Sequence, residues 1–317
     1  GGPGFASNWG GANTIGNSIV LISPPRPGGQ ETVLYQGRVS DLDLHWDARR
    51  LLFSDGRAIW EIAVDGSGLR RVSKEDPPVT HYDACYLPDG RICCVSNACE
   101  QAVPCTGGAD VGNLHLMDAD GSNETRVAFD QDHNWNPTVL NDGRVLYSRW
   151  EYTDTPHYFS RLLFRMNPDG TGQMEYYGSN SYWPNAMYWP RPIPGHPTMV
   201  SCVVSGHHGV SRVGEMVLLD PARGRHEADG VVQRIGGYGQ RVEPVILDQL
   251  VIDTWPRYAA PYPLAEPETN RGAGKYFLAC VQDDERSGWD VCLVDVFDNV
   301  TRILSGGYMT PIPLQPR

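Results

Sequence analysis

"DLDLHWDARRLLFSDGRAIWEIAVDGSGLRRV", residues 41–72, is the stretch that decides the fold. It begins with a short apolar strand, turns at a D-A-R step, and continues with two more apolar runs, LLF and AIWEIAV. A D-G-S turn then leads to a last, more polar strand. Because Asp followed by Gly supplies the positive φ that tight hairpins need, the pattern predicts four consecutive strands joined by short turns.

This unit recurs twice, in residues 81–127 and 133–177. The second strands read ICCV and VLYS, and the third strands read NLHLMDA and RLLFRMN. The D-G of the final turn falls at Asp65, Asp120 and Asp169, steps of roughly 50 residues that are typical of propeller blades with insertions. A solenoid or a β-sandwich is the alternative, but units that share their hairpin chemistry favour a propeller.

Two degenerate units follow, in residues 183–235 and 262–304. The N-terminal "SIVLISPPRPGGQETVLYQ" reads as a third and a fourth strand, and the C-terminal "YMTPIPLQPR" reads as a lone leading strand. Joining both ends in one composite blade would remove the exposed sheet edge. We therefore predict a six-bladed all-β propeller with a composite closing blade, a seven-bladed ring being the alternative. Residues 1–317 would form a single domain, and the opening without Met suggests a piece processed or excised from a larger protein.

Composition restricts the partners. The chain carries 26 basic and 38 acidic residues, a formal charge of −12, which argues against a nucleic-acid partner. No apolar run is long enough to predict a membrane span.

Eight cysteines bear on the compartment. Cys99 and Cys105 enclose "EQAVP", a short loop that a disulfide could close. The sequence contains no C-x-x-C-H, so we expect no covalently attached haem in this chain. The cysteines favour an exported protein, periplasmic or extracellular, with one or two disulfides.

Histidines near the starts of the first strands are the first candidates for chemistry, because first strands line the channel of a propeller. Imidazoles together with a carboxylate would suit a divalent metal such as Zn, and Ca is a second possibility. Hydrogen bonding to the neighbouring blade is the structural alternative. The candidate metal ligands are His45, His81, Asp83, His133, His207 and His208.

His207 and His208 stand in "SGHHG", residues 205–209. On a regular strand they would point to opposite faces, but Gly206 and Gly209 allow a bend that brings both to one face. A buried turn histidine beside a surface histidine is the alternative. If the chain is an enzyme, His133, His207 or His208 would be the general base, and Arg149 or Arg212 would hold a substrate carboxylate.

Longer motifs carry a family resemblance. "ACEQAVPC", "DQDHNWNPTVLNDGRVLYSRWEYTDTPHY", "RPIPGHPTMVSCVVSGHHG" and "PIPLQPR" together resemble the middle domain of the hydrazine synthase alpha subunit, a family of exported bacterial propellers with PD40/TolB-like repeats. The resemblance covers nearly the whole chain and implies a six-bladed propeller. Members that carry haem attach it through C-x-x-C-H, which is missing here, so the haem role has no residue in this sequence.

Three functions remain open. The first is a non-catalytic binding or assembly module with a protein partner, a second copy or a glycan as its ligand. The second is a metal-dependent lyase or hydrolase acting on a glycan at the channel face. The third is a subunit of a hydrazine-synthase-like redox complex whose haem lies elsewhere.

Overall fold

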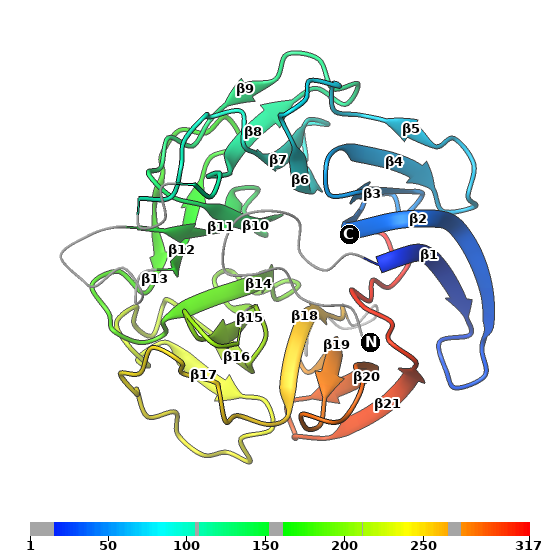
Figure 1. The fold of residues 1–317 in the computed structure, drawn as a ribbon. Helices are drawn as coiled ribbons and strands as arrows, with labels where there is room; N and C mark the ends of the chain where they lie inside the picture. Colours follow the sequence, from blue (N-terminus) through cyan, green and yellow to red (C-terminus); the bar gives the residue numbers. More distant parts are fainter. Residues whose placement is uncertain (1–15, 105–107, 152–160, 211, 266–273) are drawn as a thin grey trace.

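The computed structural model of the chain describes residues 16–104, 108–151, 161–210, 212–265 and 274–317. Within these ranges the regular structure is entirely β-strand, which confirms the all-β prediction. The sheets are arranged in a ring around a common centre (Figure 1). Among the same residues, no helix has the length and apolar character needed to pass through a membrane.

The first sheet joins a hairpin to the first repeat unit. Its strands, in spatial order, are β1 (Gly16–Ser23), β2 (Gln30–Leu44), β3 (Arg50–Ser54), β4 (Ile59–Ala63) and β5 (Arg70–Arg71). The long β2 pairs with β1 along its first part and with β3 from Ser40 onward. The hairpin expected near the N-terminus is therefore present, and its second strand runs directly into the innermost strand of the next unit.

Four further antiparallel units follow in chain order. The second unit contains β6 (His81–Tyr86), β7 (Ile92–Ser96), β8 (Asn113–Met117) and β9 (Thr125–Arg126). The third contains β10 (Asn134–Val139), β11 (Val145–Trp150), β12 (Arg161–Met166) and β13 (Met174–Tyr177). The fourth contains β14 (Ala186–Pro192), β15 (Val200–Ser205), β16 (Glu215–Leu219) and β17 (Val231–Arg234). The fifth contains β18 (Arg257–Pro263), β19 (Tyr276–Gln282), β20 (Asp290–Asp295) and β21 (Val300–Ser305).

The D-G turns form as the sequence predicts. Gly66, Gly121 and Gly170 have φ values of 83°, 81° and 86°. In each turn the preceding Asp carboxylate accepts hydrogen bonds from the residue two positions later, as Asp65 does from the Ser67 amide at 2.9 Å and hydroxyl at 2.6 Å. The D-G-[ST] motif is therefore a self-contained turn that fixes the third hairpin of each of the first three units.

The innermost strands share a second structural feature, which was not predicted from the sequence. Each contains a β-bulge, and the bulge includes one residue with positive φ. These residues are Asp41, Asp83, Asn136, Trp189 and Ala260, with φ between 46° and 56°. A bulge of this kind bends the strand and redirects one side chain.

The C-terminal segment differs from the sequence expectation. Residues 306–317 are not assigned as a strand, although Thr310 repeats the left-handed conformation with φ of 53°. The segment returns from β21 to β2 (Figure 1), where Ile312 packs against the core of the first unit. Tyr308 donates a hydrogen bond to Glu31 of β2. Side-chain contacts and the hydrogen bond from the Arg317 amide to the Trp46 carbonyl at 3.1 Å, rather than a ladder of backbone hydrogen bonds, connect this end to the first sheet. The fifth unit also begins earlier than predicted, at Arg257 rather than Tyr262.

Candidate functional site

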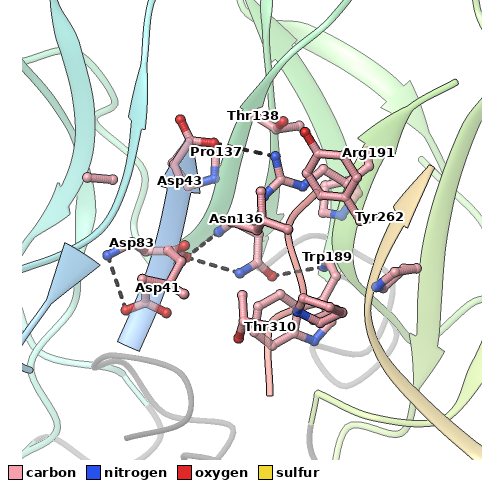
Figure 2. A pocket seen from close by; sticks show the side chains of 17 residues that line it. Asp41, Asp43, Asp83, Asn136, Pro137, Thr138, Trp189, Arg191, Tyr262 and Thr310 are labelled. Carbon is pink, nitrogen blue, oxygen red and sulfur yellow. Dashed lines mark hydrogen bonds and ion pairs between the residues drawn. The ribbon is translucent and has the colours of Figure 1, made fainter. Parts of the chain in front are cut away.

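A narrow pocket lies at the centre of the ring, where the innermost strands meet (Figure 2). Its free volume is about 30 Å³, room for only one or two water molecules. Each left-handed residue of the innermost strands contributes to the lining, and so does Thr310 of the C-terminal segment. The pocket is therefore built from equivalent positions of successive units.

Polar side chains at these positions connect one unit to the next. Asp41 Oδ2 accepts a hydrogen bond from the Asp83 amide at 3.3 Å. Asp83 Oδ2 in turn accepts from the Asn136 amide at 2.5 Å and from Asn136 Nδ2 at 3.1 Å. Asn136 Oδ1 accepts from the Trp189 amide at 3.0 Å. Figure 2 shows this chain of contacts, in which a carboxylate or amide of one unit holds the backbone of its neighbour. We call it the Asx chain.

The Asx chain brings two carboxyl groups together in a buried place. Asp41 and Asp83 are 6% and 8% exposed. Burial, reinforced by the charge of Asp41, raises the pKa of Asp83 to about 7, although hydrogen bonds from Asn136 oppose the rise. Near neutral pH this carboxyl therefore takes up a proton more readily than an ordinary aspartate.

A second layer of charge lies beside the Asx chain. Asp43 is buried and accepts a hydrogen bond from the Tyr86 amide at 3.0 Å. Arg191 Nη1 lies 3.5 Å from its Oδ1, and Arg317 Nη2 lies 3.0 Å from its Oδ2. The charged groups of the pocket thus contact one another and hold β2, β14 and the C-terminal segment together.

The histidines predicted to line the channel do not occupy equivalent positions. His81 begins β6, two residues before the left-handed Asp83, and His133 precedes β10, three residues before Asn136. His45 comes after the last residue of β2, four residues past Asp41. Its position is therefore at the opposite end of an innermost strand from the other two.

His45 and His81 each contact local partners. His45 Nε2 lies 2.8 Å from Arg50 Nη2, and its Nδ1 lies 2.7 Å from Asp47. His81 Nε2 lies 2.8 Å from Glu124 Oε1, which is also 3.0 Å from His115 Nδ1. Although burial acts to raise it, the contacts with His115 and His81 hold the pKa of Glu124 well below its usual range.

His133 and His207, in contrast, lie in one cluster. The ring of Trp150 stands between them, 6.3 Å from the His133 ring and 5.4 Å from the His207 ring, measured between centroids. His133 Nδ1 accepts a hydrogen bond from the Gly112 amide at 3.0 Å. Burial, helped by the charges of Arg212 and Arg161, lowers the pKa of His133 to about 3, so this imidazole is neutral.

Motifs that are distant in the sequence meet around this cluster. Val103 and Val111, from the region of "ACEQAVPC", pack with Trp135 and Trp150. Ala186 and Tyr188 of β14 complete the apolar part, and Cys99 packs against it. We call this region the tryptophan cluster.

The two adjacent histidines lie in different environments. His207 is 1% exposed, whereas the side chain of His208 is 50% exposed. His208 Nδ1 lies 2.9 Å from Asp248, and the His207 amide donates to the Asp248 carbonyl at 3.0 Å. The pair therefore joins the end of β15 to the connection between β17 and β18, with one ring buried and one facing solvent.

The arginines predicted to hold a carboxylate differ in their surroundings. Arg149 Nε lies 2.9 Å from Asp130, and its Nη2 lies 2.9 Å from Glu151. Arg212 is fully buried, with its guanidinium carbon 5.9 Å from the Trp135 ring centroid. The Arg149 side chain is already paired with two carboxylates of the chain.

Neither the metal site nor the disulfide receives support from the described residues. Among them, no group of three or more His, Cys, Asp or Glu side chains is arranged to hold a metal ion. Cys99 Sγ lies 3.1 Å from the Val111 carbonyl, but Cys105 lies outside the described residues. Both assignments stay predictions.

The residues that sequence reasoning missed are Asp41, Asp43, Asp132, Arg161 and Arg317. Asp41 and Asp43 alternate with leucines in "DLDL", which reads as an ordinary half-exposed strand. Arg161 opens the apolar run "RLLFRM" and is fully buried, an environment that arginine rarely occupies.

No protein-family model matches the sequence, and no curated protein sequence matches it. Among solved structures, hydrazine synthase from Kuenenia stuttgartiensis matches 92% of this chain with a TM-score of 0.66 and 15% identity. The chain covers 42% of that protein, less than half of its length.

Two further structures match nearly end to end. A putative TolB from Agrobacterium tumefaciens has a TM-score of 0.58 and 13% identity over 93% of this chain and 92% of its own. A chain in a nidogen/laminin complex has a TM-score of 0.54 and 12% identity, again over 93% and 92%. At these identities the likeness shows a TolB-like propeller fold and leaves the activity open.

Proposed function

We propose that this chain is an exported propeller module that binds a protein partner, and that its contact surface is the loop before β18. Residues 245–252 of this loop, which we call the apolar loop, connect β17 to β18. Val245, Ile246 and Leu247 are consecutive in sequence and are 49%, 64% and 47% exposed. Consecutive exposed apolar side chains are unusual on a monomer surface and are typical of contact sites.

The backbone of the apolar loop is held in place, which is the observation that carries the proposal. Asn185 Nδ2 donates to the Leu247 and Asp248 carbonyls at 2.5 and 3.2 Å. The His207 amide donates to the Asp248 carbonyl as well. Val251 is 1% exposed and faces inward. The loop thus presents its apolar side chains from a fixed backbone, so that little conformational entropy would be lost on binding.

The "SGHHG" motif supports this arrangement. A Cβ atom at Gly206 would lie 3.1 Å from the Leu250 amide nitrogen and 3.3 Å from the Asp248 carbonyl oxygen. A larger residue at this position would also approach the His208 carbonyl oxygen to 3.0 Å, so the backbone around the apolar loop would have to shift by a few tenths of an ångström. We therefore propose that the motif supports the apolar loop by close packing, rather than supplying a pair of metal ligands.

The comparisons are compatible with a module that works within an assembly. The match to hydrazine synthase covers less than half of that chain, and a matching chain occurs in a complex of nidogen with laminin. Membership in the hydrazine synthase alpha-like family and export remain parts of the proposal. Fractionation of the producing cells would test export, and recovery with cytoplasmic proteins would contradict it.

We also infer that the ring has six blades, with the hairpin β1–β2 and the C-terminal segment forming the closing blade. Five innermost strands contribute a left-handed residue to the central pocket, and Thr310 contributes a sixth. Six equivalent positions favour this count over a seven-bladed ring.

Site-specific photocrosslinking tests the binding proposal. A photoreactive amino acid at position 246 should give one defined adduct in the producing cells, with another protein or with a second copy of the chain. Leu247→Asp should lower the yield of this adduct by about tenfold, because it places a charge in an apolar contact.

Phe297 provides the matched control position. It is 68% exposed in the turn between β20 and β21. A crosslinker at this position should not give the same adduct. No adduct from position 246, or the same adducts from both positions, would contradict the proposal.

A further inference from the structure

Two cysteines of the second unit face each other across a hairpin. Cys85 of β6 and Cys93 of β7 are direct partners in the antiparallel register, and Tyr86 and Ile92 form the next pair toward the turn. Both cysteines are free thiols in the structure, and they are 3% and 0% exposed. They belong to one core cluster, whereas the adjacent Cys94 belongs to another. Because side chains alternate along a strand, the first two thiols share one face of the sheet and Cys94 points to the other.

The register brings the two backbones to the separation that a disulfide needs. The Tyr86 amide donates to Asp43 and so points away from β7, which makes Tyr86 and Ile92 a non-hydrogen-bonded pair and Cys85 and Cys93 a hydrogen-bonded pair. The Cα atoms of such a pair are about 5.5 Å apart, a common distance in disulfides. The Cβ atoms need to approach by about 1 Å, a small adjustment next to the bulge of β6.

The two thiols already interact with each other. A hydrogen bond between them, reinforced by burial, raises the pKa of Cys85 well above its ordinary value. Two other buried cysteines have partners of a different kind: Cys94 lies opposite His115, and Cys202 lies opposite Val217. A matched pair of thiols, rather than a single buried thiol, therefore distinguishes this position.

We propose that Cys85 and Cys93 form a disulfide when the chain folds in the presence of a disulfide oxidant, such as oxidised glutathione. The thiolate of one cysteine attacks a sulfur of the oxidant and releases one thiol. The thiolate of the other then attacks the cysteine sulfur of the mixed disulfide and releases a second thiol. The two cysteines thus lose two protons and two electrons, and the oxidant is reduced to two thiols.

Burial determines when this bond forms. In the folded chain both sulfur atoms are shielded from solvent, and the raised pKa keeps Cys85 protonated and therefore unreactive. The two residues belong to one local hairpin, so they can meet before the second unit has packed against its neighbours. The bond accordingly forms during folding, and the finished core then protects it from reductants.

The bond holds a strand on which the centre of the ring depends. Cys85 directly follows the bulge of β6, and Asp83 of the Asx chain lies within that bulge. A covalent link between β6 and β7 at this point prevents a shift of register, which would separate Asp83 from Asn136. The oxidised chain should therefore melt at least about 2 °C above the reduced chain. Equal melting temperatures would overturn this effect on β6.

Peptide mapping tests the bond itself. The chain is unfolded, reduced and refolded with oxidised and reduced glutathione, and remaining thiols are alkylated before digestion with trypsin without reductant. Trypsin cuts after Arg91, between the two cysteines, and Cys85 is the one cysteine of residues 75–91. This peptide should stay joined to residues 92–126, and reduction should separate the two. Because the test is made with purified chain, it is independent of export and of the apolar loop.

Cys94→Ala is the matched control, because Cys94 is adjacent and equally buried but lies in the other core cluster. It should retain the joined peptides, and Cys93→Ala should lose them together with the redox dependence of the melting temperature. Complete alkylation of Cys85 after refolding with oxidised glutathione, or joined peptides that persist in Cys93→Ala, would overturn the proposal. Should Cys93→Ala fail to fold, fragmentation of the joined peptides from Cys94→Ala decides alone, since it distinguishes Cys93 from Cys99.

Discussion

Asp83 holds two neighbouring units together, but the burial of its carboxyl group lowers the stability of the protein at neutral pH. Its carboxylate accepts two hydrogen bonds from Asn136, but it is buried near Asp41, and its pKa rises to about 7. The folded state therefore binds a proton that the unfolded state, with an ordinary pKa of 3.8, releases earlier. By linkage, this residue makes the protein less stable as the pH rises from 3.8 to about 7, and the loss is complete above that range.

Asp83→Asn should remove this dependence. Asparagine tolerates the left-handed backbone and keeps an oxygen that accepts from the Asn136 amide. The free energy of unfolding of the variant, relative to the unmodified chain, should rise by roughly 1–4 kcal/mol between about pH 5 and about pH 8. Urea denaturation at several pH values measures this difference.

Asp65→Asn gives a control of opposite sign. Hydrogen bonds from Ser67 lower the pKa of Asp65, so its contribution to stability is present above its ordinary pKa and is lost as the pH falls. A constant difference between Asp83→Asn and the unmodified chain across the pH range would refute the assignment.

The histidines show what a sequence can and cannot predict at the scale of single residues. His45, His81 and His133 look equivalent because each stands near the start of a repeat. The bulge determines which residues of the innermost strands occupy equivalent positions in the ring. Where a bulge falls depends on strand register, which composition does not encode. The D-G-[ST] turns were predictable because their chemistry is local: the residues that make the turn are adjacent. Buried Arg161 was not, since its partners come from distant parts of the chain.

At the scale of strands, the Asx chain explains how neighbouring units are held together. In the described part of the chain, few backbone hydrogen bonds link one unit to the next, the main ones being the parallel pairing of β12 with β14 and the bridge between Gly214 and Tyr258. Asp41, Asp83 and Asn136 supply side-chain acceptors for the amides of the following innermost strand. Aspartate and asparagine suit the task because they tolerate positive φ and carry a short acceptor.

Asn136→Ala should therefore destabilise the protein by about 2–4 kcal/mol, because it leaves the buried Trp189 amide without its acceptor and removes the Nδ2 donor to Asp83. Thermal or urea unfolding measures the change. Asn180→Ala is the matched control: Asn180 has nearly the same φ, 56° against 49°, but is exposed. It should cost about 1 kcal/mol, the strain of alanine at positive φ. Equal effects of the two substitutions would show that only the backbone conformation matters.

At the scale of the whole molecule, the ring has to be closed by parts from both ends of the described chain. The repeat pattern predicted this closure, and in the proposed six-bladed ring the hairpin β1–β2 would provide its larger part. A leading strand with a regular ladder was expected from "YMTPIPLQPR". Pro311 and Pro313 cannot donate backbone hydrogen bonds, and the structure uses side chains in their place. Arg317 has the largest share of this task, since it contacts Asp43, the Leu44 carbonyl and the ring of Trp46.

Arg317→Ala should open this closure. Among the described residues, removing the guanidinium leaves the buried Asp43 with Arg191, 3.5 Å away, as its charged partner, and ends a cation–π contact of 4.6 Å with Trp46. We expect a loss of about 2–4 kcal/mol in the free energy of unfolding. This is below or near the usual cost of breaking a buried ion pair, because the Arg317 side chain is 20% exposed.

Asp43→Asn combined with Arg317→Ala should recover part of the loss, since the unpaired charge is then gone. Arg302→Ala, which removes exposed ion pairs with Asp283 and Asp290 on β20 and its neighbouring turn, should cost less than about 1 kcal/mol. If Arg317→Ala were as mild as Arg302→Ala, ring closure would depend on the apolar contacts of Ile312 and not on this charge.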